Sequence, residues 1–571
     1  MADDTISTRR IYALGLLGAL LMYLCWYPFD QGYLAWVAFV PLFLLVRIDR
    51  WRKRFYVAMF ASAVAYYLPT LSWIRVAHPM MYLSWIGLTL YCASWQVCTI
   101  ALIRQLLARR VPLTLAAPLV WTFTDYLRAH FPTGFSWLEP LGLRHLTGFG
   151  WYFPGYSQHG STLLMQCADI AGVYGLTFLV VLVNATLTDA VRFGLHAMQK
   201  DDSPTPAEPL AELVAPRPPR LPVRAIATAL SLLALAMAYG YYRLGQTTTT
   251  PGPTVALIQT NLEQEVKMDK GEDTLASGKR LCDEACFPTD RSPRPDLVVW
   301  PETTFPIDWV EITGPYVAPN AVAGAKKYRE KEFDPLAIRW KTDVLLGLNS
   351  LDRESDARTW LYNSALLLPK GGAKPLRYDK MHLVPFGEYV PMGETLPFLQ
   401  FLTPYRHDYS CKPGERRTRF PLEGAFGKTT FGVLICYEDS DPSLARRYLD
   451  GDPVGFLVNI SNDGWFRGSA EHEEHLAICR FRAVECRRSV VRAVNMGVSA
   501  VIDSNGRILA LPVPDVSASK SIEAIVRGTV PIDDRKTLYC LLGDWLPMAC
   551  GVAVLVCLRR NRNPIGSRLS A

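Results

Sequence analysis

The chain has 571 residues, of which 50% are hydrophobic and 20% charged, and a formal net charge of +7. A mean hydropathy of +0.10 is too high for an ordinary soluble protein of this length, so the composition favours a chain partly embedded in a membrane. The net positive charge does not indicate nucleic-acid binding, because the basic residues are split among short clusters beside apolar segments.

Apolar segments dominate the first 245 residues and recur near the C-terminus. A helix needs about 20 mainly apolar residues to cross a bilayer. The first segment is not a cleaved signal, because no small-residue cleavage site follows it and further spans come directly after. Eight spans are predicted, at 11–27, 33–48, 55–76, 82–107, 113–131, 163–187, 223–242 and 543–558.

Basic clusters lie in alternate loops between these spans and in the C-terminal tail. They occupy residues 47–55, 104–110, 217–224 and 559–568. Because cytoplasmic loops carry an excess of Lys and Arg, this pattern predicts that both termini are cytoplasmic and that the region between the last two spans lies outside.

Three domains are predicted from this division. Residues 1–245 form a transmembrane domain of seven helices, with a cytoplasmic linker near 189–222 that is rich in Pro and Ala. Residues 246–542 form an extracytoplasmic globular domain, and residues 543–571 form a last helix with a basic tail.

The globular region alternates short apolar runs with helical patterns. The expected buried strands are bounded by Gly, Pro, Asn or Asp, and Ser504, Asn505 and Gly506 separate two alternating runs as in a hairpin. Residues 471–494 predict one long helix. This order favours α/β layers around a buried sheet. The strands are predicted at 254–262, 296–303, 342–351, 363–369, 431–436 and 454–462.

The segment EHEEH at 471–475 superficially resembles a zinc-binding helix. Its histidines, His472 and His475, are three residues apart, whereas HExxH requires a spacing of four. We therefore predict no metal site and interpret the segment as solvated residues that open a helix, with His475 close to the functional site. GxSxG and GxxxxGK[ST] motifs do not occur in the sequence.

Three polar residues stand at or just after the ends of predicted strands. They are Glu302 in DLVVWPET, Lys380 in YDKMHLVPFGEYVP and Cys436 in GVLICYED. Each has an ordinary structural explanation, as a helix cap, a surface ammonium and a small buried hydrophobe respectively. Together they supply the parts of thiol acyl chemistry.

A thiol is mostly protonated at neutral pH, so it needs a base before it can attack. Glu302 is the candidate base. Attack on an ester or amide carbonyl creates an oxyanion, which Lys380 and the backbone N–H of Tyr437 are suited to stabilise. The sequence thus predicts a nucleophilic site around Cys436.

These motifs resemble the nitrilase superfamily of carbon-nitrogen hydrolases. With the membrane segments around them, the chain resembles the apolipoprotein N-acyltransferase family of bacterial membrane enzymes. The resemblance also covers 168–185, 459–466 (NISNDGWF), 482–503 and 543–545. It implies an αββα nitrilase-like domain on the periplasmic side of the inner membrane, attached to about eight transmembrane helices.

The resemblance further implies a ping-pong reaction without a cofactor. Cys436 would take an acyl chain as a thioester from the sn-1 position of a phospholipid, usually phosphatidylethanolamine. It would pass this chain to the free amine of a diacylglyceryl cysteine on an apolipoprotein. Glu302 would be the general base, Lys380 would stabilise the tetrahedral intermediates and Glu388 would orient Lys380 or assist proton transfer.

Three further residues complete the expected site. Tyr437 and Glu438 would shape the pocket, and Trp465 would flank its entrance. Two other functions remain open at this stage. A membrane-anchored amidase of the nitrilase type would use the same residues with water as acceptor, and a transporter or scaffold would carry a catalytically dead domain.

Overall fold

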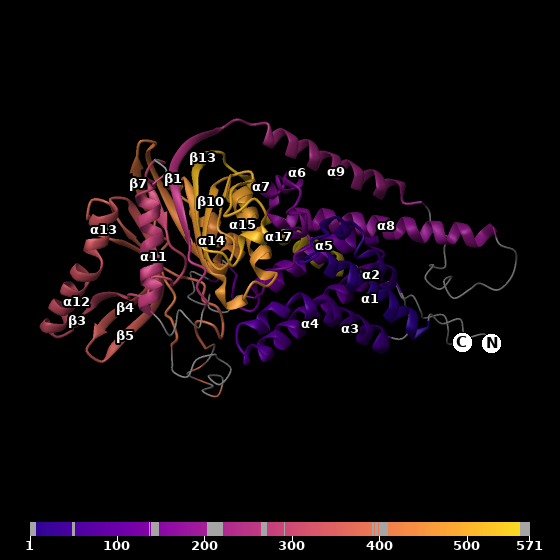
Figure 1. Ribbon diagram of the computed structural model, residues 1–571. Helices are drawn as coiled ribbons and strands as arrows, with labels where there is room; N and C mark the ends of the chain where they lie inside the picture. Colours follow the sequence, from indigo (N-terminus) through magenta and orange to yellow (C-terminus); the bar gives the residue numbers. More distant parts are fainter. Residues whose placement is uncertain are drawn as a thin grey trace.

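The fold is described from a computed structural model that covers residues 7–47, 52–135, 138, 148–201, 221–263, 271–289, 292–390, 393, 395, 398 and 409–559. Most of the predicted linker, at 202–220, lies outside these residues, as does the basic tail after 559. Figure 1 shows the strands gathered at one end of the molecule and the long helices of the N-terminal part at the other.

Two β-sheets face each other in the globular part. The first has the order β13-β1-β2-β4-β5-β6, with β3 paired to β4, and the second has the order β12-β11-β10-β9-β8-β7. In the first sheet the bounds are β1 Thr249–Gln259, β2 Leu297–Val299, β3 Trp309–Tyr316, β4 Asp343–Ser355, β5 Arg358–Leu368, β6 Leu376–Asp379 and β13 Ala524–Asp533. In the second they are β7 Phe420–Gly424, β8 Gly427–Ile435, β9 Phe456–Asn462, β10 Ser489–Asn495, β11 Ala500–Ile502 and β12 Ile508–Ala510.

The layers follow from which faces of the strands are apolar. Between the sheets, Leu345 and Leu367 of the first pack in one cluster with Val433 and Val458 of the second. Outside the first sheet lie α11 (Gly271–Cys286), α12 (Pro319–Glu332) and α13 (Asp334–Trp340), and outside the second lie α14 (Pro442–Arg447) and α15 (Glu471–Cys486). The predicted αββα sandwich is therefore confirmed.

The predicted strands are present, but the predicted helix at 471–494 is wrong in its second half. α15 ends at Cys486, where Arg487 takes a left-handed φ of +48°, and the chain continues as β10. The run Ser489–Asn495 is rich in β-branched residues and buried throughout, which suits a central strand. Beyond it, Gly506, with φ of +78°, makes the predicted turn between β11 and β12.

The N-terminal part is helical, and the last helix returns to it. The final helix, α17, packs against α5. The bounds are α1 Thr8–Leu24, η1 Gly32–Trp36, α2 Val40–Leu45, α3 Arg52–Thr70, η2 Ser72–Val76, α4 Met81–Leu107, α5 Leu113–His130, η4 Tyr156–Gln158, α6 Thr162–Met165, α7 Ala168–Ala171, α8 Val173–Asp201, α9 Val223–Leu244, α16 Leu538–Leu542 and α17 Trp545–Arg559.

The eight predicted spans are confirmed only in part. Among the described residues, three helices are long and apolar enough to cross a membrane: Met81–Leu107, Val173–Met198 and Val223–Leu244. The segment predicted at 33–48 instead folds as η1 and the six-residue α2, and that predicted at 163–187 is interrupted at Gly172, whose φ is +63°. An eight-span membrane domain is therefore not confirmed.

α15 lies between the second sheet and the N-terminal helices (Figure 1). Leu476, Cys479 and Ala483 pack with the sheet, whereas Ile478 and Phe481 pack with the N-terminal core. All five residues of EHEEH at its start are buried. The interpretation of this segment as solvated is therefore wrong, because a second layer covers the helix face that solvent would otherwise reach.

A buried aspartate joins the two parts of the chain. Asp169 of α7 accepts hydrogen bonds from Tyr239 and Arg243 of α9, at 2.7 and 2.8 Å. It also accepts from Nε of Arg487, the residue that ends α15, at 2.9 Å. Asp169 and Arg487 are almost fully buried, so this contact is shielded from solvent.

We expect Asp169→Asn to destabilise the full-length protein by about 3–5 kcal/mol, because it leaves two buried guanidinium groups without their carboxylate. Thermal unfolding in detergent measures the change. Glu284→Gln is the matched control, since Glu284 pairs with Arg280 at 2.9 Å on an exposed helix face. We expect no measurable change there. Equal melting temperatures for the two variants would contradict the proposed importance of this junction.

Candidate active site

The three residues predicted from strand ends come together between the two sheets. Glu302 follows β2 and Lys380 follows β6, both in the first sheet, whereas Cys436 follows β8 of the second. Electrostatic interactions connect the Cys436 thiol with both Glu302 and Lys380. The ends of β2, β6 and β8 thus place one carboxylate, one ammonium and one thiol near one another.

Lys380 lies at the centre of this group and is 1% exposed. Its Nζ contacts Oε1 of Glu302 at 2.9 Å and Oε1 of Glu388 at 3.0 Å. Burial disfavours the charged form, but the two carboxylates outweigh it and raise the pKa of Lys380 well above its ordinary value. The side chain is therefore an ammonium held between two acids.

Neutral donors fix the two carboxylates. The Nδ2 of Asn363, on β5, donates to Glu302 and to Glu388, each at 2.7 Å. The second oxygen of Glu302 accepts from the backbone N–H of Asn462 at 3.0 Å, and that of Glu388 accepts from Val384 N–H at 2.9 Å. Both acids are thus held in one orientation.

Cys436 is held in an unusual backbone conformation. It opens the 3-10 turn η7 (Cys436–Ser440) directly after β8, with a φ of +54°. Such a left-handed conformation costs a non-glycine residue about 1–3 kcal/mol and persists only where neighbours enforce it. Here the Nδ2 of Asn459 donates to the carbonyl oxygen of Cys436 at 3.0 Å. The sharp turn at the strand end presents the half-buried thiol to the site.

Electrostatics favour the protonated thiol at rest. Burial raises the pKa of Cys436 to about 12, and the carboxylate of Glu302 acts in the same direction, whereas Lys380 and His475 oppose the shift. At neutral pH the side chain is therefore a thiol, which would have to lose its proton to act as a nucleophile. A carboxylate among its neighbours suits that requirement.

Glu438 lies in η7, two residues after Cys436, and is fully buried. Its carboxylate accepts hydrogen bonds from backbone N–H groups of Ile435 and Met381, both at 2.7 Å, and of His382 at 3.0 Å. Burial raises the pKa of Glu438 to about 7, although these N–H groups oppose the shift. Because its partners adjoin Cys436 on one side and Lys380 on the other, Glu438 ties together the two segments that carry them.

Tyr437 and Trp465 are both half-buried. Tyr437 lines a cavity of about 20 Å³, room for about one water molecule, which also touches Tyr174 of α8 and His382. Trp465 belongs to the turn η8 (Asp463–Phe466), whose Phe466 packs edge-on against Trp73 of the N-terminal part at 4.9 Å between ring centroids.

Sequence analysis missed the asparagines that support the site. Asn363, Asn459 and Asn462 are buried and bond to Glu302, Cys436 or Glu388 as described above. Each stands in or beside an apolar run that was predicted as a strand. A buried amide within such a run needs a hydrogen-bond partner. An asparagine in a predicted buried strand therefore indicates a polar partner nearby, and this could have pointed to the site.

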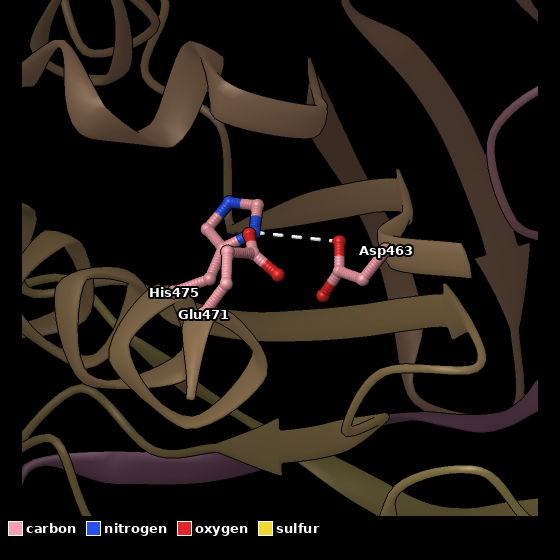
Figure 2. Close-up of side chains that lie close together, drawn as sticks. All are labelled: Asp463, Glu471 and His475. Carbon is pink, nitrogen blue, oxygen red and sulfur yellow. Dashed lines mark ion pairs between the residues drawn. The ribbon is translucent and has the colours of Figure 1, made fainter. Parts of the chain in front are cut away.

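One group among the described residues has the spacing of a metal site. Ligand atoms of Asp463, Glu471 and His475 lie within 4.8 Å of one another (Figure 2). A metal would need a neutral histidine nitrogen. Burial and Arg492 favour that neutral form, but Asp439 and Asp463 outweigh them and raise the pKa of His475 well above its ordinary value. The donor set therefore fits a protonated histidine better than a metal ion.

Comparisons with known proteins cover both parts of the chain. Residues 18–186 match the family model described as "Apolipoprotein N-acyltransferase N-terminal domain", and residues 254–530 match the model "Carbon-nitrogen hydrolase". The apolipoprotein N-acyltransferase of Geobacter metallireducens is 32% identical over 99% of this chain and 98% of its own length. That of Rhodopirellula baltica is 27% identical, with 94% of each chain covered. A crystal structure of a carbon-nitrogen hydrolase from Helicobacter pylori is 17% identical, covering 51% of this chain and 93% of its own, with a TM-score of 0.33.

We expect Lys380→Met to slow alkylation of Cys436 at pH 8 at least ~10-fold, because the ammonium that lowers the thiol pKa is lost. Iodoacetamide modification of the purified protein, followed by mass spectrometry of the peptide spanning 429–446, gives the rate. Lys374→Met, at an exposed lysine, is the control. An unchanged rate in folded Lys380→Met would show that this ammonium does not act on the thiol.

Proposed function

Because the chain belongs to the apolipoprotein N-acyltransferase family of the carbon-nitrogen hydrolase superfamily, we propose that it moves an acyl chain from the sn-1 position of a phospholipid to the amine of a diacylglyceryl cysteine on an apolipoprotein. The observation that supports a working site is the buried ammonium of Lys380 between Glu302 and Glu388, beside the Cys436 thiol.

In the first half-reaction, Glu302 takes the proton from the Cys436 thiol as the sulfur attacks the ester carbonyl carbon. The carbonyl oxygen becomes an oxyanion, which Lys380 stabilises by its positive charge. The intermediate then collapses, the bond to the glycerol oxygen breaks and that oxygen receives the proton from Glu302. A lysophospholipid leaves and the acyl chain remains on Cys436 as a thioester.

In the second half-reaction, the amine of the lipoprotein cysteine attacks the thioester carbonyl. Glu302 accepts a proton from the amine, and Lys380 again faces the oxyanion. The carbon–sulfur bond breaks, the sulfur recovers a proton and the acyl chain is released on nitrogen as an amide. Both tetrahedral intermediates therefore use the same three side chains.

The surrounding residues have supporting roles in this proposal. Glu388 orients Lys380 through its 3.0 Å contact, and Glu438 holds the backbone on both sides of the site. Tyr437 offers its N–H to the oxyanion and shapes the pocket, and Trp465 flanks the entrance. The reaction as written needs no cofactor.

A position at a membrane surface suits both substrates, since each carries lipid chains. The helices Met81–Leu107, Val173–Met198 and Val223–Leu244 are suited to hold the site there. From the basic clusters we propose an inner-membrane protein with residues 246–542 on the periplasmic side, residues 1–245 and 543–571 in or beside the membrane and both termini cytoplasmic. Phosphatidylethanolamine is the proposed donor.

We expect a labelled acyl chain from phosphatidylethanolamine to attach to the wild-type protein in detergent and to be released by hydroxylamine, as a thioester is. Cys436→Ala should carry no label. Cys411→Ala is the matched control, because this second thiol also interacts with Glu388, Lys380 and Glu302 yet should be dispensable.

Label that persists on Cys436→Ala and disappears from Cys411→Ala would move the nucleophile to Cys411. Label that resists hydroxylamine in the wild type would contradict a thioester altogether.

A further inference from the structure

The buried start of α15 carries a histidine that the reaction above does not use. His475 is 1% exposed and packs between the second sheet and the N-terminal part. On the N-terminal side, the ring of Trp151 lies 5.6 Å from the imidazole, centroid to centroid. Because His475 is buried between these two layers, any effect that it has on the proposed reaction passes through the residues that it contacts.

Both ring nitrogens of His475 face carboxylates. The Nε2 lies 2.9 Å from Oδ1 of Asp439, and the Nδ1 lies 3.4 Å from Asp463 and 3.3 Å from Glu471. Figure 2 shows the ring of His475 directed at the last two of these acids. Only the Nε2 contact is a hydrogen bond, and the Nδ1 lies at ion-pair distance from its two acids. Three carboxyl groups around one ring attract positive charge, so the imidazolium form fits this surrounding.

Two of the three acids around His475, Asp439 and Asp463, belong to the two turns beside the proposed site. Asp439 lies in η7, three residues after Cys436, and Asp463 opens η8, two residues before Trp465. The imidazolium therefore joins, by its own contacts, the turn that carries the thiol and the turn that carries the entrance tryptophan.

A second buried cation reinforces the same connection. Arg492 of β10 donates to Asp463 at 2.8 Å and to the amide oxygen of Asn459 at 2.5 Å. The amide nitrogen of that Asn459 donates to the carbonyl of Cys436. The three acids around His475 thus lie near two buried cations, His475 and Arg492. These positive charges limit the free-energy cost of burying the acids.

We propose that His475 is a positioning residue for the nucleophile, which fixes the turns of Cys436 and Trp465 against each other and places a buried positive charge behind the thiol. The inference rests on the proposed role of Cys436 as the acyl carrier. It adds a residue that touches neither lipid nor lipoprotein.

Charged groups from several elements act on Cys436 and on His475. Around Cys436 they are Glu302 and Asp463, which favour the thiol, and Lys380 and His475, which favour the thiolate. Around His475 they are Asp439, Asp463, Glu471 and Arg492. Removing the positive charge of His475 therefore leaves the thiol facing more net negative charge, so its pKa should rise.

The test is the pH dependence of Cys436 alkylation in the full-length protein in detergent. Samples are exposed to iodoacetamide across a pH series, digested with trypsin and measured on the peptide 429–446, which contains no other cysteine. We expect His475→Gln to shift the curve of alkylation rate against pH, followed below the midpoint where the protein stays folded, to higher pH by at least half a unit. This corresponds to ~3-fold less thiolate at a given pH below the midpoint.

His472→Gln is the matched control on the same helix. His472 is equally buried, and neither of its ring nitrogens has a hydrogen-bond partner among the described residues. Burial lowers the pKa of His472, so it is neutral and supplies no cation. Its replacement should leave the curve of Cys436 alkylation rate against pH unchanged.

If His475→Gln fails to fold, the double variant His475→Gln/Glu471→Gln removes a carboxyl group together with the cation, which limits the unpaired negative charge left among the buried acids. Burial raises the pKa of Glu471 to about 7, so this acid is partly neutral already. The double variant should still show an upward shift, smaller than that of His475→Gln, because it loses a full positive charge and only part of a negative one.

A wild-type curve of alkylation rate against pH in folded His475→Gln or in the double variant would overturn the proposal, as would an equal shift in His472→Gln. Alkylation requires no acyl donor, so this result is independent of acyl transfer. A failure of the proposed function would appear instead as the absence of a thioester on a Cys436 that still alkylates normally.

Discussion

The pairing of Lys380 with Glu302 and Glu388 is the interaction on which the rest of the site depends. A lysine that is 1% exposed would lose its charge without these acids, and the acids would be unpaired without it. The two ion pairs connect the end of β2, the end of β6 and the loop after β6. In the proposed reaction they also define where the negatively charged intermediate forms, because the ammonium is already in place before substrate arrives.

A second polar layer holds the thiol against this group. Glu438 bonds to backbone on both sides of the site, and Asn459 bonds to the carbonyl of Cys436. Such buried networks are stabilising only when each member has partners, and then they fix one geometry. The left-handed conformation of Cys436 is one that this layer can enforce. The geometry of the proposed nucleophile therefore depends on buried residues of this layer.

Much of this site could be predicted because apolar runs stop abruptly before Glu302 and at Cys436, and the motif around Lys380 supplied the third residue. Such a boundary is local and is visible in one sequence. The burial of His475 is not local, since α15 is covered by a sheet on one side and by helices more than 300 residues earlier on the other. Five consecutive polar residues indicate a solvent-exposed segment. Only the packing of the sheet and the N-terminal helices against α15 shows that they are buried. The same limit explains the predicted helix at 471–494, where the change to β10 depends on the central position of that strand in the sheet.

The N-terminal helices pack beside the site, and in the proposed reaction their role is to favour transfer over hydrolysis. The proposed thioester is open to hydrolysis, so it would have to form in a place that an amine on a lipid anchor reaches more readily than water. The most direct measurement is the fate of the isolated acyl-enzyme, followed by intact mass in detergent with and without a diacylglyceryl peptide. We expect the acyl mass to persist without the peptide and to move to its amine when it is added. Release as free fatty acid at the same rate in both cases would contradict acyl transfer and identify water as the acceptor.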